Sequence, residues 1–244
     1  MRSCLRLLGF VLSLAAAGVA KAQGPTPQFR PAVLGRGPDS LVNKIDAEDL
    51  LKRGQLDGAV MFSAIVAPNG AATSTWTYRR IPGSEALENE VDKRLQGIKF
   101  TPPIYQHQPV SVMLYGTVIF SAQDKPHIHV FLNQDPLEIQ RASDFIGPQP
   151  VIGGDSKFKG VRAPDPDMPV SVSGIADLAL KVSATGNPEK MDVVNEEPPL
   201  LGFKEMAMED FAGAKFIPAF RDGDPTACDT VLPVCYKPVP QEGD

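Results

Sequence analysis

The chain of 244 residues repeats itself at a fixed offset of 116 residues without a gap. Most residues that recur are glycine, proline, valine or phenylalanine, which set turns or fill a core. The recurring pairs are Gly58/Gly174, Val66/Val182, Gly70/Gly186, Gly97/Gly213, Lys99/Lys215, Phe100/Phe216, Pro102/Pro218 and Pro109/Pro225. A constant offset over this many positions predicts two copies of one small fold. The repeat therefore constrains architecture strongly and chemistry weakly.

The first segment of each copy alternates between apolar and other residues, which is typical of a half-buried strand. The apolar positions are Val60, Phe62, Ala64 and Val66 in the first copy and Ala176, Leu178, Leu180 and Val182 in the second. Pro68-Asn69-Gly70 and residues 184–188 then supply turn residues. A second strand, at 73–80 or 190–195, is expected to return antiparallel to the first.

A helix is expected after the second strand of each copy, because apolar residues recur at helical spacing. The stripe is Leu87, Val91, Leu95 and Ile98 in the first copy and Phe203, Ala207, Phe211 and Ala214 in the second. Ser84 is the expected N-cap of the first helix, and Gly97 and Gly213 stand where each helix should end. Lys-Phe-x-Pro, a loop and a last strand follow, at 110–120 or at 226–236 with Pro233 inside it.

The predicted fold class is therefore α+β, with two β-β-α-β units, each a three-stranded antiparallel sheet with a helix packed on one face. The expected boundaries are a lead-in at 23–45, a first domain at 46–123, a Pro- and Gly-rich linker at 124–168, a second domain at 169–238 and a tail at 239–244. Residues 47–53 predict a short helix ahead of the first domain, and 127–132 a strand within the linker.

The first 22 residues have the three parts of a secretory signal. Arg2 and Arg6 give a positive start, an apolar run follows, and Ala20-Lys21-Ala22 matches a cleavage site. The alternative is an uncleaved anchor, but the apolar run is shorter than the roughly 18 to 20 residues that span a bilayer. We expect cleavage after Ala22, a periplasmic or secreted location, and no membrane span in the mature chain.

Cleavage would leave 21 Lys and Arg against 29 Asp and Glu. Such an acidic chain without a basic cluster opposes phosphate binding, so nucleic acid is not an expected partner. Cleavage also leaves Cys228 and Cys235 in an oxidising compartment, where a disulfide is the first interpretation. On one continuous strand, however, they would lie about 23 Å apart, so a bridge requires a bend near Asp229 or Pro233. Both alternatives stay open at this point.

The order of strands, turns and helix, with its glycines and Lys-Phe-x-Pro, resembles the C-terminal domain of TonB-type energy transducers. The motifs that carry the resemblance are Gly58, Gly70 and 98–102 in the first copy, and Gly174, Gly186, 215–218 and 222–225 in the second. The resemblance implies a periplasmic, non-enzymatic domain that pairs an extended segment of a receptor with its last strand, by β-strand addition. The implied partner-binding residues are Val110, Val112, Leu114, Val118 and Phe120, with Val231, Val234 and Tyr236 in the second copy.

Candidate chemistry is sparse, and neither a catalytic residue nor a cofactor is expected, because no hydrolase or phosphate-binding motif occurs. His127 and His129 have the spacing of two metal ligands on one strand face, but an ordinary strand is favoured. Glu196-Glu197 and Asp222/Asp224 lie in expected turns, where acidic residues are usually solvated. Trp76 and Tyr78 face either a binding surface or the core, and the core is favoured.

The sequence thus predicts a non-enzymatic protein that binds protein or peptide partners in the bacterial envelope through sheet edges. The alternative is a structural envelope protein that self-associates through those edges, for example as a homodimer. The third hypothesis for the function is a metal-binding protein or a hydrolase.

Overall fold

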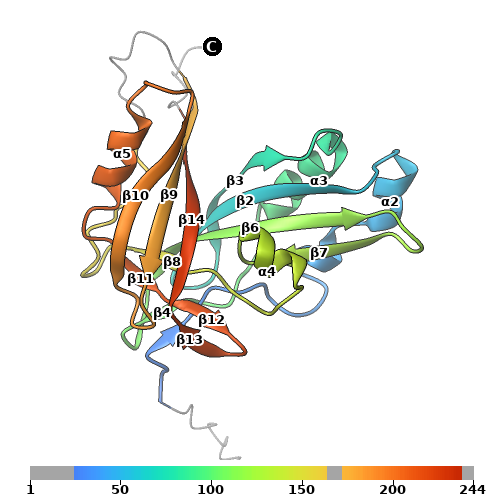
Figure 1. The fold of residues 1–244 in the computed structure, drawn as a ribbon. Helices are drawn as coiled ribbons and strands as arrows, with labels where there is room; N and C mark the ends of the chain where they lie inside the picture. The colour runs from blue at the N-terminus through green and yellow to red at the C-terminus, as the bar shows by residue number, and fades with distance from the viewer. Residues whose placement is uncertain (1–24, 164–171, 238–244) are drawn as a thin grey trace, which may run out of the picture.

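The structure is a computed structural model that describes residues 25–163 and 172–237 (Figure 1). The expected signal peptide at 1–22, the tail at 239–244 and residues 164–171 lie outside these ranges. The fold is α+β, with mostly antiparallel sheets and few helices, as predicted.

The elements near the N-terminus are β1 (Phe29–Arg30), α1 (Leu41–Lys44), α2 (Ala47–Lys52), β2 (Gly58–Val66), β3 (Ala72–Arg80), α3 (Glu85–Leu95), β4 (Ile104–Tyr105), β5 (Gln108–Pro109) and β6 (Ser111–Ser121). Next come β7 (His127–Phe131), α4 (Pro136–Gln140) and β8 (Gln149–Ile152). The remaining elements are β9 (Gly174–Val182), β10 (Pro188–Glu197), α5 (Phe203–Asp210), β11 (Lys215–Ile217), β12 (Ala219–Arg221), β13 (Asp224–Thr226) and β14 (Cys228–Tyr236).

The larger sheet has six strands, where a three-stranded sheet was predicted. Its order is β11-β8-β6-β2-β3, and β7 also pairs with β6. Two strands come from the segment expected to be a linker: β7, which confirms the strand-like run at 127–132, and β8, which was not predicted. The sheet is larger because these strands pair with β6 and because β11 pairs with β8.

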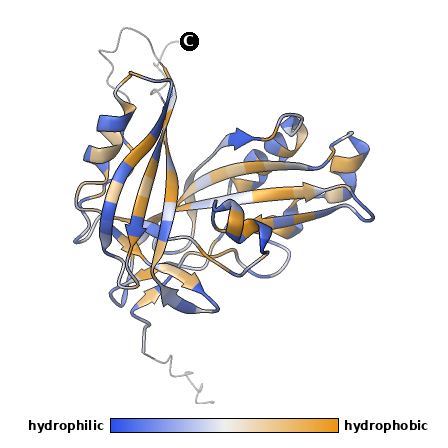
Figure 2. Ribbon diagram, viewed as in Figure 1, coloured by the Kyte–Doolittle hydropathy of each residue, from blue (hydrophilic) through white to orange (hydrophobic). Residues whose placement is uncertain are grey.

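The smaller of the two main sheets has three strands in the order β10-β9-β14, all antiparallel. Two minor sheets are β1-β4-β5 and β12-β13. Its strands run in a clearly different direction from β2, β3 and β6, and α5 lies along one side of it (Figure 1). Figure 2 shows β10 alternating between hydrophilic and hydrophobic residues, whereas β2 and β6 are largely hydrophobic. This contrast follows from burial, since β6 is buried along nearly its whole length and β10 is mostly exposed.

Two hydrophobic cores hold the elements together. The first lies between the six-stranded sheet and α3 and contains the predicted stripe Leu87, Val91, Leu95 and Ile98. The second surrounds the three-stranded sheet and α5 and contains Phe203, Ala207, Phe211 and Ala214. Since each fully buried aliphatic or aromatic side chain stabilises a fold by roughly 1.5 to 3 kcal/mol, these stripes fix both helices on their sheets.

The predicted N-cap of the first helix holds its position but not its hydrogen bond. Ser84 is the N-cap residue of α3, yet its side chain makes no capping bond. The side chain of Gln55 caps the helix instead, because its Oε1 accepts a hydrogen bond from the backbone N–H of Leu87 at 2.9 Å. The helix expected at 47–53 is confirmed as α2, whose N-cap Asp46 accepts from Asp49 N.

Candidate protein-binding groove

The edge predicted to bind a partner in the first copy is not free. One side of β6 pairs with β2 along its length. Its other side pairs with β7 from Thr117 to Ser121, and with β8 at Ser111 and Val112. The predicted contacts Val112, Leu114, Val118 and Phe120 are fully buried in the first core, and Val110 packs against it. The prediction of a free binding edge at 110–120 was therefore wrong, because strands of the supposed linker pair with both ends of β6.

The last strand of the second copy is an edge strand over part of its length. β14 pairs with β9 from Cys228 to Tyr236, and no strand among the described residues pairs with its other side. Val234 and Tyr236, two predicted contacts, are fully buried in the second core, whereas Val231 is 46% exposed. Only the N-terminal half of β14, from Cys228 to Val231, is accessible.

Of the two alternatives left open for Cys228 and Cys235, the structure has the one without a disulfide. Both cysteines are free and lie on β14, which is continuous through Pro233. Seven residues of extended strand separate their Cα atoms by about 23 Å, far beyond the reach of a disulfide. Pro233 fits without a break because an edge strand has one side on which a missing N–H costs nothing.

The C-terminal half of β14 is buried because it lies on the outer face of the six-stranded sheet. Cys235 lines one cavity with Tyr78 and another with Trp76, both of β3, and Leu232 lines a third with Tyr115 of β6. Trp76 and Tyr78 are partly buried and pack against the second core, so the preference for a core role was correct. However, they lie on the six-stranded sheet, whereas the core against which they pack surrounds the three-stranded sheet.

A bidentate ion pair holds the two sheets together beside this contact. Nη1 and Nη2 of Arg79 on β3 donate to the two carboxylate oxygens of Asp177 on β9, at 2.8 and 2.9 Å. Asn195 Nδ2 donates to the same carboxylate at 3.0 Å. The hydrogen bond to Asp177 is the main reason that the pKa of Arg79 is raised, so the Arg79 guanidinium stays charged.

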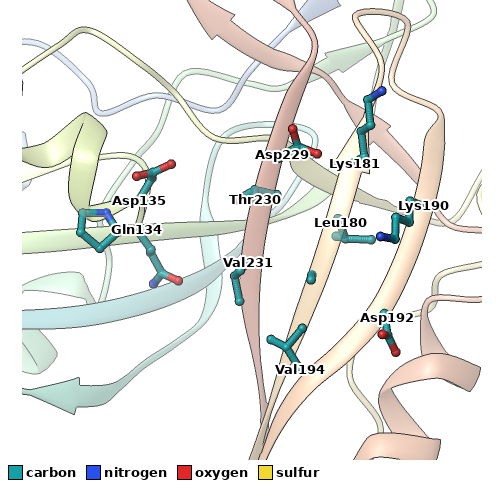
Figure 3. Close-up of a pocket in the computed structure, with 12 residues that line it drawn as sticks. Gln134, Asp135, Leu180, Lys181, Lys190, Asp192, Val194, Asp229, Thr230 and Val231 are labelled. Atoms are coloured by element: carbon teal, nitrogen blue, oxygen red, sulfur yellow. The ribbon is translucent and has the colours of Figure 1, made fainter.

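A groove of about 390 Å³ lies on the face of the three-stranded sheet opposite α5 (Figure 3). Its floor comes from β9, β10 and β14, and its far wall from the residues that lead into α4. The lining residues include Gln134, Asp135, Pro136, Ala179, Lys181, Lys190, Asp192, Val194, Asp229 and Val231. Val194 is 61% exposed, and Leu137, next to the lining residue Pro136, is also 61% exposed. Exposed aliphatic side chains around a groove are typical of a protein-binding surface.

Sequence reasoning missed most residues of this groove. The signal for its wall was present, because Asp135 followed by Pro136 is an N-cap and first-turn pattern. Asp135 Oδ1 accepts from Leu137 N at 2.8 Å and from Glu138 N at 3.4 Å, which starts α4. Glu138 is in turn held by Arg221 through two bonds of 2.8 and 3.0 Å, so α4 is fixed to β12.

The other candidate residues do not form a site. The rings of His127 and His129 pack edge to face, with centroids 4.9 Å apart. In the described ranges, no group of three or more His, Cys, Asp or Glu side chains is placed to hold a metal ion. Glu196 Oε1 accepts from the backbone N–H groups of Leu201 and Phe203, which is a structural role ahead of α5.

Comparisons with models of protein families, with curated proteins and with solved structures give no match to this chain. Within the described residues, none of the helices has the length and hydropathy needed to cross a bilayer.

Proposed function

We propose that the chain contains two copies of one β-β-α-β unit, similar to TonB C-terminal domains, and acts as a non-enzymatic protein-binding protein of the bacterial envelope. Strand register supports the two copies. Gly58 pairs with Phe120 and Val66 with Val112. At an offset of 116, Gly174 pairs with Tyr236 and Val182 with Cys228. The signal-like N-terminus supports the envelope location, and the acidic charge argues against nucleic acid.

The binding surface that we propose is the groove beside β14. Six positions of its floor correspond, at the same offset, to six positions of the six-stranded sheet. The pairs are Ser63/Ala179, Ile65/Lys181, Trp76/Asp192, Tyr78/Val194, Met113/Asp229 and Tyr115/Val231. In the six-stranded sheet, five of these positions, all except Ser63, belong to or pack against the core that contains the buried half of β14. The observation that carries the proposal is that one copy of this face already holds an extended strand, whereas the other copy is an open groove.

The partner that fits is an extended segment that lies along Cys228–Val231. No backbone hydrogen bond extends from the outer side of this segment to another described residue. The opposite edge of the same sheet, β10, is a poorer template, because it is rich in charged residues and has two register irregularities. β-strand addition to β14 would use main-chain hydrogen bonds for affinity and the groove for side-chain selection.

Selection of peptides from a phage-displayed library of random linear 12-mers tests this proposal, with mature protein (residues 23–244) as bait. We expect enrichment of β-branched sequences. Because Val231 lies in the groove, Val231→Gln should weaken binding of the selected peptides about ten-fold, in fluorescence anisotropy, as loss of one interface anchor does. The matched control is Leu56→Gln, which removes an aliphatic side chain that is 71% exposed away from the groove.

Two results would contradict the proposal: no enrichment, or equal affinity of the Val231→Gln and Leu56→Gln proteins. Sedimentation of the same proteins separates the alternative role in self-association. If a dimer forms and only Val231→Gln dissolves it, a second copy of the chain occupies the groove.

A further inference from the structure

The charge of the groove selects what can enter it. Where the six-stranded sheet has Trp76 and Met113, the groove has Asp192 and Asp229. Asp135 adds a third carboxylate from the opposite wall, and Figure 3 shows it across the open space from Asp229. The apolar surface that receives β14 in one sheet is thus replaced in the other by a charged one, with three carboxylates and two lysines.

The cations of the groove compensate these carboxylates only in part, since Lys181 is the cross-strand partner of Asp229 and interacts with its charge. Lys181 Nζ binds Glu189 at 3.1 Å, and Lys190 lies farther across the sheet on β10. Arg221 is engaged by Glu138 on α4. Among the described residues, no Lys or Arg forms a salt bridge with Asp135, Asp192 or Asp229.

The negative charge of these carboxylates also affects the pKa of the Cys228 thiol. Cys228 lies next to Asp229 at the free end of β14, and its pKa is raised to about 12. Burial is the main cause, the negative charges of Asp229 and Asp135 add to it, and the positive charge of Arg221 opposes it more weakly. Both carboxylates therefore act on the same stretch of the strand edge, from two different elements.

We propose that the groove binds an extended segment in which a lysine or arginine side chain lies between Asp135 and Asp229, with small or β-branched neighbours against Val231 and Val194. This inference rests on the proposed function, since it specifies the chemistry of the segment that binds the same groove. A cation fits because carboxylates on the far wall and on the floor of the groove can pair with a positive charge from two sides. An acidic segment would meet like charges at the same place.

Three sets of labelled nonapeptides test the proposal. Each peptide consists of Thr, Ser and Val except at its central residue. The central residue is Arg in the first set, Gln in the second and Glu in the third. We expect the Arg set to bind the mature protein at least ten-fold more tightly than the Gln set, with the Glu set weakest. Raising the salt from 50 to 500 mM should reduce the Arg preference several-fold, because exposed charge pairs are screened.

Asp135→Asn and Asp229→Asn should each reduce the Arg preference about three- to five-fold, and the double variant should nearly abolish it. Asn at 135 keeps the cap of α4, since Asn caps a helix as well as Asp does. Asp39→Asn is the control, because its side chain is 90% exposed and does not line the groove. Circular dichroism and melting curves check that all variants are folded.

The outcomes separate the two proposals. If none of the three sets binds, both the groove and its charge preference are wrong. If the sets bind with equal affinity, or the Arg preference survives the double variant, the cation inference is wrong and the proposed function stands.

Discussion

Two glycines show how single residues fix the position of a whole segment. Gly70 and Gly186 have φ of +83° and +78°, and each carbonyl accepts from the N–H of the phenylalanine in Lys-Phe-x-Pro, at 2.8 and 3.0 Å. A Cβ at either glycine would collide with that phenylalanine's carbonyl oxygen. The turn and the Lys-Phe-x-Pro strand are therefore joined by a contact that only glycine allows.

Gly186→Ala is expected to lower the free energy of unfolding by about 3 kcal/mol or more, from both positive φ and the collision. Gly223→Ala is the matched control, because Gly223 has φ of +87° and no atom within 4 Å of an added Cβ. It should cost only about 1 to 2 kcal/mol. Urea unfolding curves give both values, and equal losses would show that the collision is unimportant.

Among the elements, β14 combines two environments in one strand. Its first half is an accessible edge, and its second half is buried between the two sheets. Burial is the leading cause that raises the pKa of both Cys228 and Cys235 to about 12. Cys228 is partly buried and Cys235 is buried, and the two thiols lie far apart on one extended strand, so they are neither oxidised together nor strongly nucleophilic.

Both thiols should react with iodoacetamide at pH 8 at least about a hundred-fold more slowly than an ordinary exposed thiol, whose pKa is about 8.5. Unfolding in urea should make both react rapidly, as mass spectrometry of the labelled protein would show. The pKa of each thiol is higher in the folded than in the unfolded state, so the folded protein is relatively more stable while the thiols are protonated. This contribution to stability is complete below about pH 8.5 and is lost as the pH rises towards 12. Rapid labelling of native Cys235, or a mass two units low from a disulfide, would contradict the structure.

The elements were largely predictable, and the sheet partners were not. Alternation at Val60–Val66 and the stripe at Leu87–Leu95 predicted β2 and α3, since each segment carries its own period. β8 escaped prediction because Pro150 and a length of four residues gave no clear alternation. The predicted edge of β6 failed for the same reason: nothing in the sequence of β6 shows which distant strand covers it. The groove wall at Asp135-Pro136 was visible as a helix start, but not its position beside β14.

For the whole molecule, the contact between the sheets matters most. The buried half of β14 lies on Trp76, Tyr78 and Tyr115, and Arg79 binds Asp177 at its side. The Asp177 side chain is only 12% exposed, and its loss would leave Arg79 with only the more distant and more exposed Glu197 carboxylate, at 3.7 Å. A bidentate pair in such a place is stronger than one in solvent.

A double-mutant cycle with Arg79→Ala and Asp177→Ala should give a coupling energy of about 1 to 3 kcal/mol. The same cycle on Lys181 and Glu189, whose side chains are 50% and 48% exposed, should give below about 0.5 kcal/mol. Chemical unfolding monitored by Trp76 fluorescence measures both. Similar coupling in the two pairs would show that the sheets are not joined through Arg79.

The path of β11 has a consequence for how this protein can be divided. The chain builds β9, β10 and α5 on the smaller sheet, then places Lys215–Ile217 in the larger one beside β8, and only afterwards returns to β14. The chain therefore passes from the smaller sheet to the larger one and back, so the two halves are not consecutive, independent domains. No cut of the backbone between them yields two complete pieces, so the molecule should melt as one body, in a single calorimetric transition, despite its internal repetition.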